Sequence, residues 1–415
     1  MNCKGCENSS PTNKPNIEIA DIFREYGQEY LNTHNVSSEQ IEVINKIITC
    51  RTAAQGGHIE FCDNCGHHRN AYNSCRNRHC PKCQTMAKEE WLDNRKAELL
   101  PVPYFHLVFT LPHDLNPLIL NNSRVLLKLL FSSVNEVIKA FAADPQWRLE
   151  GKPGFIGVLH TWTQTLLDHF HIHCLIPGGV LSKDKTKWIP SKSNFLFKTS
   201  SLMLAFKNIY LKGLKELREK GELEFSGNTA KYENDLEFNK LIKKVGKKKW
   251  CGYAKKPFSG PEKVLEYLGR YVHKVAISNY RIISLENGVV TFTWKDRSDN
   301  NATKFMKLKA DEFMRRFLLH VLPKRFRKIR YFGFLSPRYK KVNILLIREL
   351  LCVVGEIFTP PVNESIEEKM LRLTGKDINC CPICKKGRML QSQNFKPAYF
   401  KYIVPHKTKE VYDTS

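Results

Sequence analysis

The stretch HTWTQTLLDHFHIHCLIPGG (160–179) lies within residues 155–180, which predict a pair of β-strands that ends in a Pro-Gly-Gly turn. In a strand, residues i and i+2 lie on one face. His171 and His173 therefore present two imidazoles together, while Ile172 and Cys174 face a core. Imidazole pairs of this kind bind divalent cations. A His-x-His pair alone is weak evidence for a metal site, because such histidines are more often structural.

The surrounding sequence predicts a mixture of strands and helices. Residues 104–112 (YFHLVFTLP) alternate apolar side chains up to a closing proline, which is typical of a strand. Residues 126–143 follow a strongly apolar helical pattern, and residues 289–296 (VVTFTWKD) predict a further strand. Nearer the N-terminus, Ser37 followed by Gln40 is a capping-box signal for a helix.

The composition indicates a folded protein with a polyanionic partner. The 415 residues suggest two to three domains of about 150 residues each. Hydrophobic residues make up 42% and charged residues 26%, which excludes a disordered chain. The net charge of +25 points to nucleic acid or to an acidic membrane face.

No apolar run approaches the ~18 residues of a membrane span, and the N-terminus does not resemble a signal peptide. We therefore expect a cytoplasmic, nucleoid-associated protein. In a reducing compartment, the 14 cysteines are expected to be metal ligands or core residues rather than disulfides.

A dense group of cysteines and histidines lies between residues 50 and 84 and predicts a small domain held together by metal. One or two zinc ions would supply the folding free energy that such a short segment lacks. The two Cys-x2-Cys pairs predict one zinc site made of Cys62, Cys65, Cys80 and Cys83. A second, interleaved site is left open for Cys50, His58, Cys75 and His79.

A further cysteine group near the C-terminus comprises Cys380, Cys381 and Cys384. It lacks an obvious second pair. The candidates to complete it are Cys3 with Cys6, or His406.

A pair of tyrosines occupies the predicted helix EYLGRYVH (266–273). Tyr267 and Tyr271 stand at i and i+4, so both phenols leave the same helix face. A phenol with a pKa of ~10 becomes a useful nucleophile at neutral pH only beside positive charge or a base. Arg270, His273 or a metal ion are candidates for that role. The alternative is that these side chains form an apolar core stripe.

Taken together and in order, five motifs resemble the two-tyrosine, rolling-circle bacterial insertion-sequence transposases, which are HUH nucleases. The motifs are RTAAQGGHIEFCDNCGHHRNAYNSCRNRHCPKCQ, YFHLVFTLP, HTWTQTLLDHFHIHCLIPGG, YLGRYVHKVAIS and RRFLLHVLP. They run from about residue 45 to about residue 340. The segments before and after this region are covered less specifically.

The resemblance implies an α+β fold, with an HUH-type, mostly antiparallel sheet, packed helices and a small N-terminal zinc-binding domain. We expect four consecutive parts: a polar tail with N-terminal helices (1–48), the zinc-binding domain (49–95), the HUH catalytic domain (100–345), and a C-terminal helix with a cysteine cluster (346–415).

The resemblance also implies a catalytic Mg²⁺ or Mn²⁺ ion, held by His171 and His173, that polarises a phosphate of single-stranded DNA. We favour Gln164 as the third ligand, because it continues the alternation of His160 and Trp162; His160 and His169 are the alternatives. Imidazoles alone would also suit zinc or nickel, so the choice of ion comes from the family.

In that family one tyrosine attacks the phosphorus and becomes linked to the DNA 5′ end, and the second tyrosine cleaves a second strand. Tyr267 and Tyr271 match these roles, and their order of attack stays open.

Basic side chains near the tyrosines and in two Lys/Arg-rich stretches (243–256 and 323–341) are expected to contact DNA phosphates, and interleaved aromatic rings to stack on unpaired bases. The alternatives are solvated charge and, for Phe332 and Phe334, a place in the core. The predicted DNA-binding residues are Arg270, Lys274, Lys247, Lys248, Lys249, Lys324, Arg325, Arg327, Lys328 and Arg330.

The sequence contains no G-x4-G-K-[ST] phosphate loop, so strand displacement is expected to depend on a host helicase or on replication. Two other functions fit parts of the pattern: a replication initiator or relaxase of the same chemistry, and a non-catalytic, zinc-dependent DNA-binding regulator.

Overall fold

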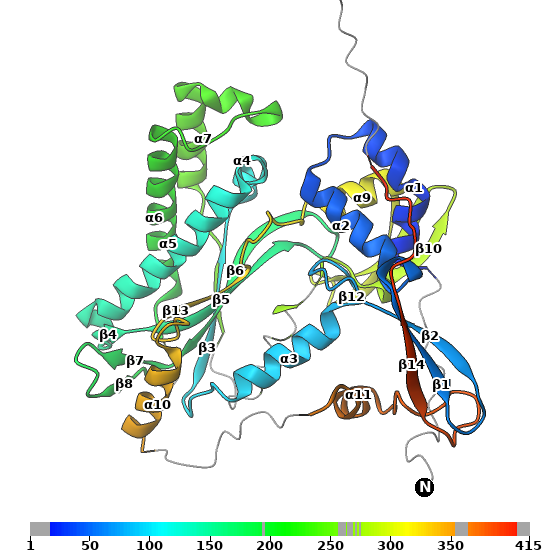
Figure 1. Cartoon of the computed structure of the whole chain (residues 1–415). Coiled ribbons are helices and arrows are strands. Elements are labelled where there is room, and N and C mark those ends of the chain that lie inside the picture. The colour runs from blue at the N-terminus through cyan, green and yellow to red at the C-terminus, as the bar shows by residue number, and fades with distance from the viewer. Residues whose placement is uncertain are drawn as a thin grey trace, which may run out of the picture. The chain divides into compact units, whose positions relative to one another are not determined.

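A computed structural model describes residues 17–192, 196–255, 263, 269, 272–273, 275–352 and 364–404. The chain divides into two compact units (Figure 1). The first unit combines Met1–Ala87, Val275–Val321 and Pro361–Ser415, and the second combines Lys88–Lys274 and Leu322–Pro360. Each unit is therefore built from segments that are distant in the sequence. This division differs from the four consecutive parts expected above, because residues 275–321 and the C-terminal cysteines belong with the first unit.

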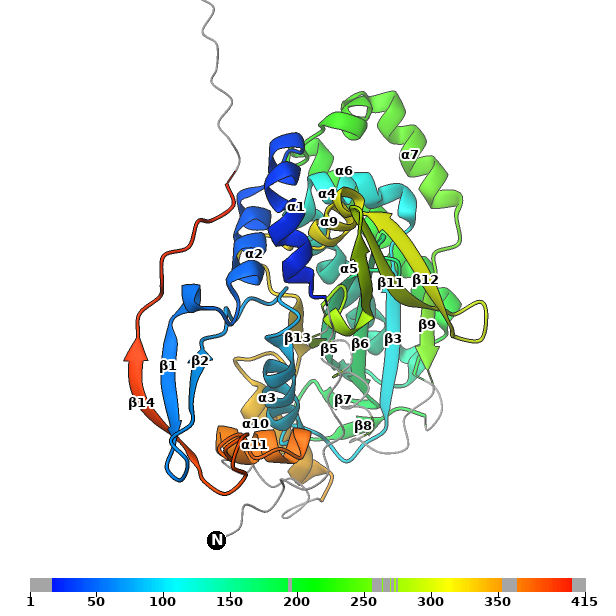
Figure 2. The ribbon, with the colours of Figure 1, turned by 90° about the vertical axis from the view of Figure 1, so that its right-hand side faces the viewer.

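The second unit is built around a five-stranded antiparallel sheet in the order β13-β5-β6-β3-β9. The strands are β3 (Tyr104–Thr110), β5 (Gly154–Trp162), β6 (Asp168–Pro177), β9 (Gly252–Lys255) and β13 (Ile329–Gly333). The histidine-bearing strand β6 is central, with β5 and β3 as its neighbours (Figure 2). The strands predicted at 104–112 and within 155–180 are confirmed, as is the mostly antiparallel sheet.

One face of this sheet packs on two long helices, α5 (Ser123–Ala143) and α6 (Thr199–Glu219), which lie together on one side of it in Figure 1. Phe109 and Ile172 from the sheet belong to this fully buried core. The predicted helix at 126–143 is confirmed as the apolar part of α5. Side chains alternate along a strand. Because Ile172 of β6 faces this core, its neighbours His171 and His173 lie on the opposite face of the sheet.

The opposite face carries the histidines and a smaller apolar cluster, to which Val158 and Leu175 contribute. Leu92 of α3 (Gln84–Lys96) and Ile347 of α10 (Lys340–Leu350) belong to the same cluster. Among the described residues, the second unit also contains α4 (Asn116–Asn121), α7 (Asp235–Lys247) and a small sheet of β4 (Gly151–Lys152), β7 (Gly179–Ser182) and β8 (Trp188–Pro190).

The first unit contains two three-stranded antiparallel sheets and four α-helices among the residues described. The sheets are β14-β1-β2, from β1 (Gly57–Cys62), β2 (His68–Tyr72) and β14 (Met389–Phe395), and β10-β11-β12, from β10 (Ile282–Glu286), β11 (Val289–Asp296) and β12 (Ala302–Lys309). The helices are α1 (Ile19–Thr33), α2 (Ser38–Thr49), α9 (Ala310–Leu318) and α11 (Ile366–Thr374). The strand predicted at 289–296 is confirmed as β11.

A local sequence signal explains how α2 begins. The Ser37 side chain accepts a hydrogen bond from the Gln40 backbone N–H, and the Gln40 side chain accepts one from the Ser37 N–H. This is the capping box that the sequence predicts.

On α1, Phe23 packs edge-on against Phe317 of α9, with ring centroids 5.5 Å apart. Residues 275–321 thereby share a core with the N-terminal helices.

In the part of the chain that the structure describes, no helix combines the length and the apolar character needed to cross a bilayer.

Candidate active site and zinc centres

Three imidazoles meet on the histidine-bearing face of the sheet in the second unit. His160 on β5 is the register partner of His171 on β6, and His173 follows two positions later on the same face. The candidate ligand nitrogens of the three residues all lie within 4.8 Å of one another. All three residues are buried, with exposures between 4% and 8%. The fold therefore converts two adjacent strands into one compact cluster of nitrogen donors.

Hydrogen bonding orients the His171 ring so that it can bind a cation. Its Nδ1 lies 2.8 Å from the backbone carbonyl oxygen of His169. A carbonyl oxygen only accepts, so Nδ1 carries a proton, and in the neutral form of the ring the lone pair is on Nε2. That Nε2 lies 3.1 Å from Nε2 of His173. Two nitrogens at this separation are close enough to bind one ion at ordinary metal–nitrogen distances of about 2.0–2.1 Å.

A fourth histidine, His106 on β3, supports the cluster from its other side. Its Nε2 lies 2.9 Å from Nδ1 of His173, and the two rings are nearly parallel, with centroids 5.1 Å apart. His106 is 1% exposed, so the contact is shielded from water. His106 was not among the residues predicted from the sequence. The available signal is a histidine among the apolar residues of a predicted strand.

His160 is the third imidazole of this cluster, and Gln164, the third ligand favoured from the sequence, stays a prediction. The prediction for Gln164 assumed that the strand containing His160 and Trp162 continues through residue 164. In the structure β5 ends at Trp162, and Gln164 lies in the turn that leads to β6. The alternation of side chains therefore stops two residues earlier. His169 contributes its carbonyl oxygen to His171 and does not belong to the three-imidazole group.

The two predicted nucleophiles, Tyr267 and Tyr271, lie outside the described residues, as do Arg270 and Lys274. Two residues of the same stretch are described. Val272 is fully buried and belongs to the apolar cluster that also contains Val158 and Leu175, on the histidine-bearing face.

Gly269 lies against α3. A Cβ atom at this position would come within 2.9 Å of the Leu92 side chain, so a larger residue here would require that side chain to move.

Burial affects the charge of His273, another described residue of this stretch. Burial, together with the positive charge of Lys328, lowers the pKa of His273 to about 4. The imidazole is therefore neutral at pH 7. A neutral imidazole does not supply positive charge to a neighbouring phenol but can act as a base, so His273 stays a candidate in that role, beside Arg270 and a metal ion.

The first zinc centre consists of Cys50, Cys75, Cys80 and Cys83, whose sulfur atoms lie within 4.8 Å of one another. Cys50 follows the last residue of α2. The Cys83 backbone N–H donates to the Cys80 carbonyl and closes the Cys-x2-Cys turn. Hydrogen bonds from Cys75 and Cys80 lower the pKa of Cys50 to about 7, which favours the thiolate that zinc requires.

The second zinc centre consists of Cys62, Cys65, Cys381 and Cys384. It unites residues more than 300 positions apart in the sequence, with Cys62 Sγ 3.6 Å from Cys384 Sγ. The pairing of β1 with β14 brings them together, since Cys62 is the register partner of Met389. Hydrogen bonds from the Gly387 and Lys386 backbone lower the pKa of Cys384 to about 5.

The predicted set of Cys62, Cys65, Cys80 and Cys83 is thus divided between two centres, because the C-terminal strand β14 delivers a second Cys-x2-Cys pair to β1. Of the proposed second set, Cys50 and Cys75 are in a centre. His58 and His79 belong to neither group, and His58 Nε2 instead lies 3.1 Å from Glu60 Oε1.

The second centre also shows which residues complete the C-terminal cysteine group. Cys381 and Cys384 join Cys62 and Cys65, whereas Cys380 is not in the group. The proposed partners Cys3, Cys6 and His406 lie outside the described residues.

Several predicted DNA-binding side chains have contacts within the second unit. Lys248 and Lys244 lie 2.5 and 2.8 Å from the two carboxylate oxygens of Asp114 and lower its pKa to about 2. The Arg330 guanidinium stacks 4.1 Å from the centre of the Phe131 ring. Five others are exposed: Lys247, Lys249, Lys324, Arg325 and Arg327. Lys328, as noted above, acts electrostatically on His273.

The Lys-rich stretch 243–256 contains regular structure. Its first residues form the end of α7, Trp250 is buried, and β9 follows at Gly252. In the second basic stretch, Phe334 is fully buried and Phe332 stacks on Phe155 with centroids 4.5 Å apart. Both aromatic residues therefore belong to the core, as the alternative for them proposed.

The chain thus combines a histidine cluster on an antiparallel sheet with a unit that holds two four-cysteine groups suited to zinc. Two family models match: one described as "Putative transposase" over residues 154–343, and one described as "Transposase zinc-binding domain" over residues 22–111.

The chain is 43% identical over 384 residues to the putative transposase y4qJ of Sinorhizobium fredii, covering 91% of this chain and 95% of the relative. It is 30% identical over 305 residues to the transposase for insertion sequence element IS801 of Pseudomonas savastanoi pv. phaseolicola, covering 72% and 71%. The chain belongs to the family of two-tyrosine, rolling-circle insertion-sequence transposases. No solved structure matches it significantly.

Proposed function

We propose that this transposase is a metal-dependent nuclease and strand transferase in which His160, His171 and His173 hold one Mg²⁺ or Mn²⁺ ion and Tyr267 and Tyr271 are the nucleophiles. The observation that carries the proposal is the 3.1 Å separation of the two Nε2 atoms of His171 and His173, with a third imidazole beside them. Three buried imidazoles are a donor set that fits a divalent cation. The choice of Mg²⁺ or Mn²⁺ follows the family resemblance.

The reaction would begin when the phenolic oxygen of one tyrosine attacks the phosphorus of a single-stranded DNA phosphodiester. The new bond joins tyrosine to the 5′ phosphate, and the bond from phosphorus to the 3′ oxygen breaks. The phenolic proton is released and the departing 3′ oxygen gains one, so a free 3′ hydroxyl results. When bound, the divalent ion supplies Lewis-acid stabilisation of charge on the phosphate oxygens. Because the phosphodiester energy is kept in the covalent link, rejoining needs no nucleotide cofactor.

The described part of the tyrosine stretch supports a catalytic role for these residues. Val272 belongs to the same apolar cluster as Val158, the register partner of His173. Residue 272 thus belongs to the side of the sheet that carries the imidazoles. This packing supports the proposal that the phenols act beside the histidine cluster.

His106 is proposed as a positioning residue. A neutral imidazole that offers its Nε2 lone pair to a cation carries its proton on Nδ1. For His173, that Nδ1–H would donate to Nε2 of His106 across the 2.9 Å contact. Second-shell acceptors of this kind fix the tautomer and ring orientation of metal-binding histidines. His106 would therefore act through His173 and not on the DNA.

The two zinc centres are proposed to shape the DNA-binding surface of the first unit and to recognise the ends of the element. They fasten the end of α2 and the β1–β14 pair, and the buried apolar cluster beside the second centre is small. For displacement of the nicked strand we propose a host helicase or the replication machinery, because the sequence contains no phosphate-loop motif.

The proposal is tested by incubating the full chain with 5′- and 3′-labelled single-stranded oligonucleotides from both ends of its element, with Mg²⁺ or Mn²⁺. We expect a covalent protein–DNA species on a denaturing gel that carries only the label 3′ of the cleaved bond. The Tyr267→Phe/Tyr271→Phe protein should form none. An adduct of unchanged yield in the double variant would overturn the assignment of the nucleophiles.

A further inference from the structure

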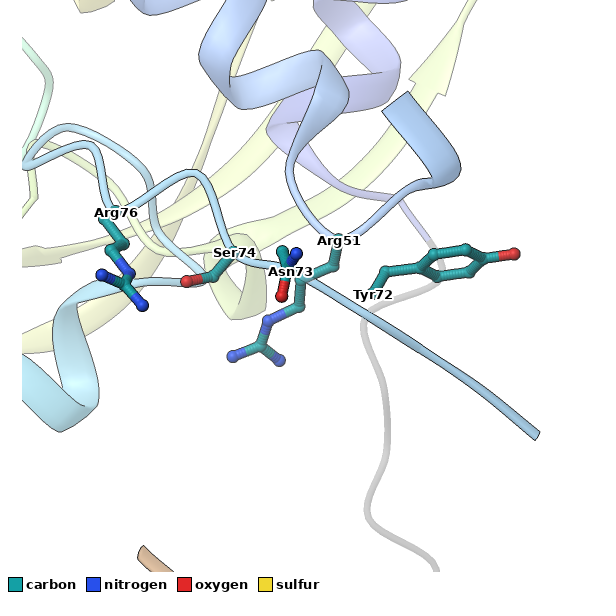
Figure 3. A pocket seen from close by; sticks show the side chains of 5 residues that line it. All are labelled: Arg51, Tyr72, Asn73, Ser74 and Arg76. Carbon is teal, nitrogen blue, oxygen red and sulfur yellow. The ribbon is translucent and has the colours of Figure 1, made fainter. Parts of the chain in front are cut away.

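The first unit contains a hollow of about 590 Å³ beside the first zinc centre, lined by Arg51, Tyr72, Asn73, Ser74 and Arg76 (Figure 3). The lining is polar and carries two guanidinium groups. Neither the predicted metal sites nor the proposed DNA-binding residues include Arg51 or Ser74. The hollow is therefore a separate feature for which a ligand can be argued from its chemistry.

The zinc centre fixes the positions of both arginines. Arg51 directly follows the zinc ligand Cys50, and Arg76 directly follows the zinc ligand Cys75. The Arg51 backbone N–H donates to the Asn73 carbonyl over 3.1 Å and ties the two segments together. Each arginine follows a ligand of the same metal centre. Metal binding therefore holds the backbone at Arg51 close to the backbone at Arg76.

Both arginines have a backbone conformation that favours glycine. The φ angle is +57° at Arg51 and +51° at Arg76. Residues with a Cβ atom adopt this left-handed region only at an energetic cost. Glycine would adopt the same conformation without this cost, so either arginine can be replaced by glycine without straining the backbone.

The side chains converge on one side of the loop. In Figure 3 the guanidinium groups of Arg51 and Arg76 extend to the same side, and Ser74 lies between them. Both arginines are exposed, and in the described segments of the chain no carboxylate forms a salt bridge with either of them. Tyr72 points away from them and packs edge-on against Phe395, so it takes no part in this cluster.

We propose that Arg51, Ser74 and Arg76 bind a backbone phosphate of DNA next to the first zinc centre. This inference rests on the proposed function in DNA transposition. Guanidinium groups form strong, charge-assisted hydrogen bonds with phosphate oxygens, and the Ser74 hydroxyl can donate a further one. Since every nucleotide carries the same phosphate, the contact would fix the position of the DNA on the first unit without reading its sequence.

The test replaces both arginines by glycine in the full chain (Arg51→Gly/Arg76→Gly). Glycine accepts the positive φ, so the guanidinium groups are removed without straining the loop. Binding of a fluorescent 30-base-pair duplex and of a 30-nucleotide single strand is measured by anisotropy between 50 and 300 mM KCl. We expect roughly tenfold weaker binding of at least one of the two DNAs at 100 mM KCl, and a salt slope that is smaller by about 0.7–0.9 per arginine.

The matched control removes two exposed positive charges from the β11–β12 hairpin of the same unit (Arg297→Gln/Lys307→Gln). It should change both quantities much less. Zinc content reports on folding and should equal that of the wild type in both variants. If the glycine variant loses zinc, Arg51→Gln/Arg76→Gln and Ser74→Ala provide the same comparison with the backbone kept as it is.

Wild-type affinity and salt slope in the zinc-loaded glycine variant, or an effect no larger than that of the control, would overturn the proposal. So would a hollow that serves only inorganic phosphate, seen as a phosphate-dependent rise in thermal stability that the variant loses while its DNA binding is unchanged. Failure of the proposed nuclease is distinguishable. It would appear as a wild-type protein that binds DNA but forms no covalent adduct. If the wild type does form the adduct, the glycine variant should still form it at saturating oligonucleotide.

Discussion

Nε2 of His106 lies 2.9 Å from Nδ1 of His173, so the strand β3 supports the ring of a predicted metal ligand on the neighbouring strand β6. The contact is buried and its geometry is that of a hydrogen bond. It leaves Nε2 of His173 facing Nε2 of His171, which is the arrangement that two ligands of one ion require.

Replacing His106 should weaken metal binding without removing a ligand. For His106→Leu we expect a 10- to 100-fold loss of Mn²⁺ affinity, measured by calorimetry or by the electron paramagnetic resonance signal of free Mn²⁺. His106→Gln keeps a side-chain acceptor and should recover part of that loss. Equal and unchanged affinity in both variants would show that His106 has only a packing role.

The choice between His160 and Gln164 as third ligand can be made by the same measurement. His160→Ala removes an imidazole from the cluster, so we expect Mn²⁺ affinity to fall by at least tenfold. Gln164→Ala changes a residue in the turn after β5 and should have a smaller effect. A larger loss of affinity for Gln164→Ala than for His160→Ala would instead support Gln164 as the third ligand, as side-chain alternation predicts.

The two zinc centres predict a specific pattern of zinc loss. Native mass spectrometry of the purified protein should show two zinc ions per chain. Cys381→Ser should lose one of them and lower the thermal stability, because Cys381 completes the second centre. Cys251→Ser, which changes an exposed free cysteine outside both centres, should keep both.

A protein with Cys381→Ser that retains full zinc content would contradict this division of the ligands. It would instead fit the set predicted from the two N-terminal Cys-x2-Cys pairs.

Asp114 should make the stability of the second unit depend on pH in the acid range. Lys244 and Lys248 lower its pKa from 3.8 to about 2 in the folded protein. Because the pKa of Asp114 is lower in the folded than in the unfolded protein, its ionised carboxylate stabilises the fold at pH values above 3.8. This stabilisation is lost as the pH falls from 3.8 towards 2. Denaturation of wild type and Asp114→Asn should therefore differ most above pH 4 and converge near pH 2. A difference that stays constant across this range would exclude the ion pairs as its cause.

Local signals in the sequence predicted much of the second unit. The strands β3, β5 and β6 were predicted because alternation of side chains is a property of each strand alone. The pairing of His171 with His173 was predicted for the same reason, since residues i and i+2 share a face wherever the strand lies.

Relationships between distant segments could not be predicted in this way. The position of His160 opposite His171 depends on where β5 ends and on the register of two strands. The second zinc centre depends on β14 pairing with β1, across more than 300 residues. A Cys-x2-Cys pair indicates metal binding but not which other pair it joins. The N-terminal cysteines were therefore predicted as ligands but grouped differently, and Cys381 and Cys384 were not placed with them.

The central claim is that the histidine cluster and the tyrosines form one active site. The most direct test measures covalent adduct yield on single-stranded element ends for wild type and for His171→Ala/His173→Ala, at equal zinc content, over a range of Mg²⁺ and Mn²⁺ concentrations. We predict that the histidine variant forms no adduct although Tyr267 and Tyr271 are intact. A tyrosine–DNA adduct formed by this variant at the wild-type rate would contradict the account.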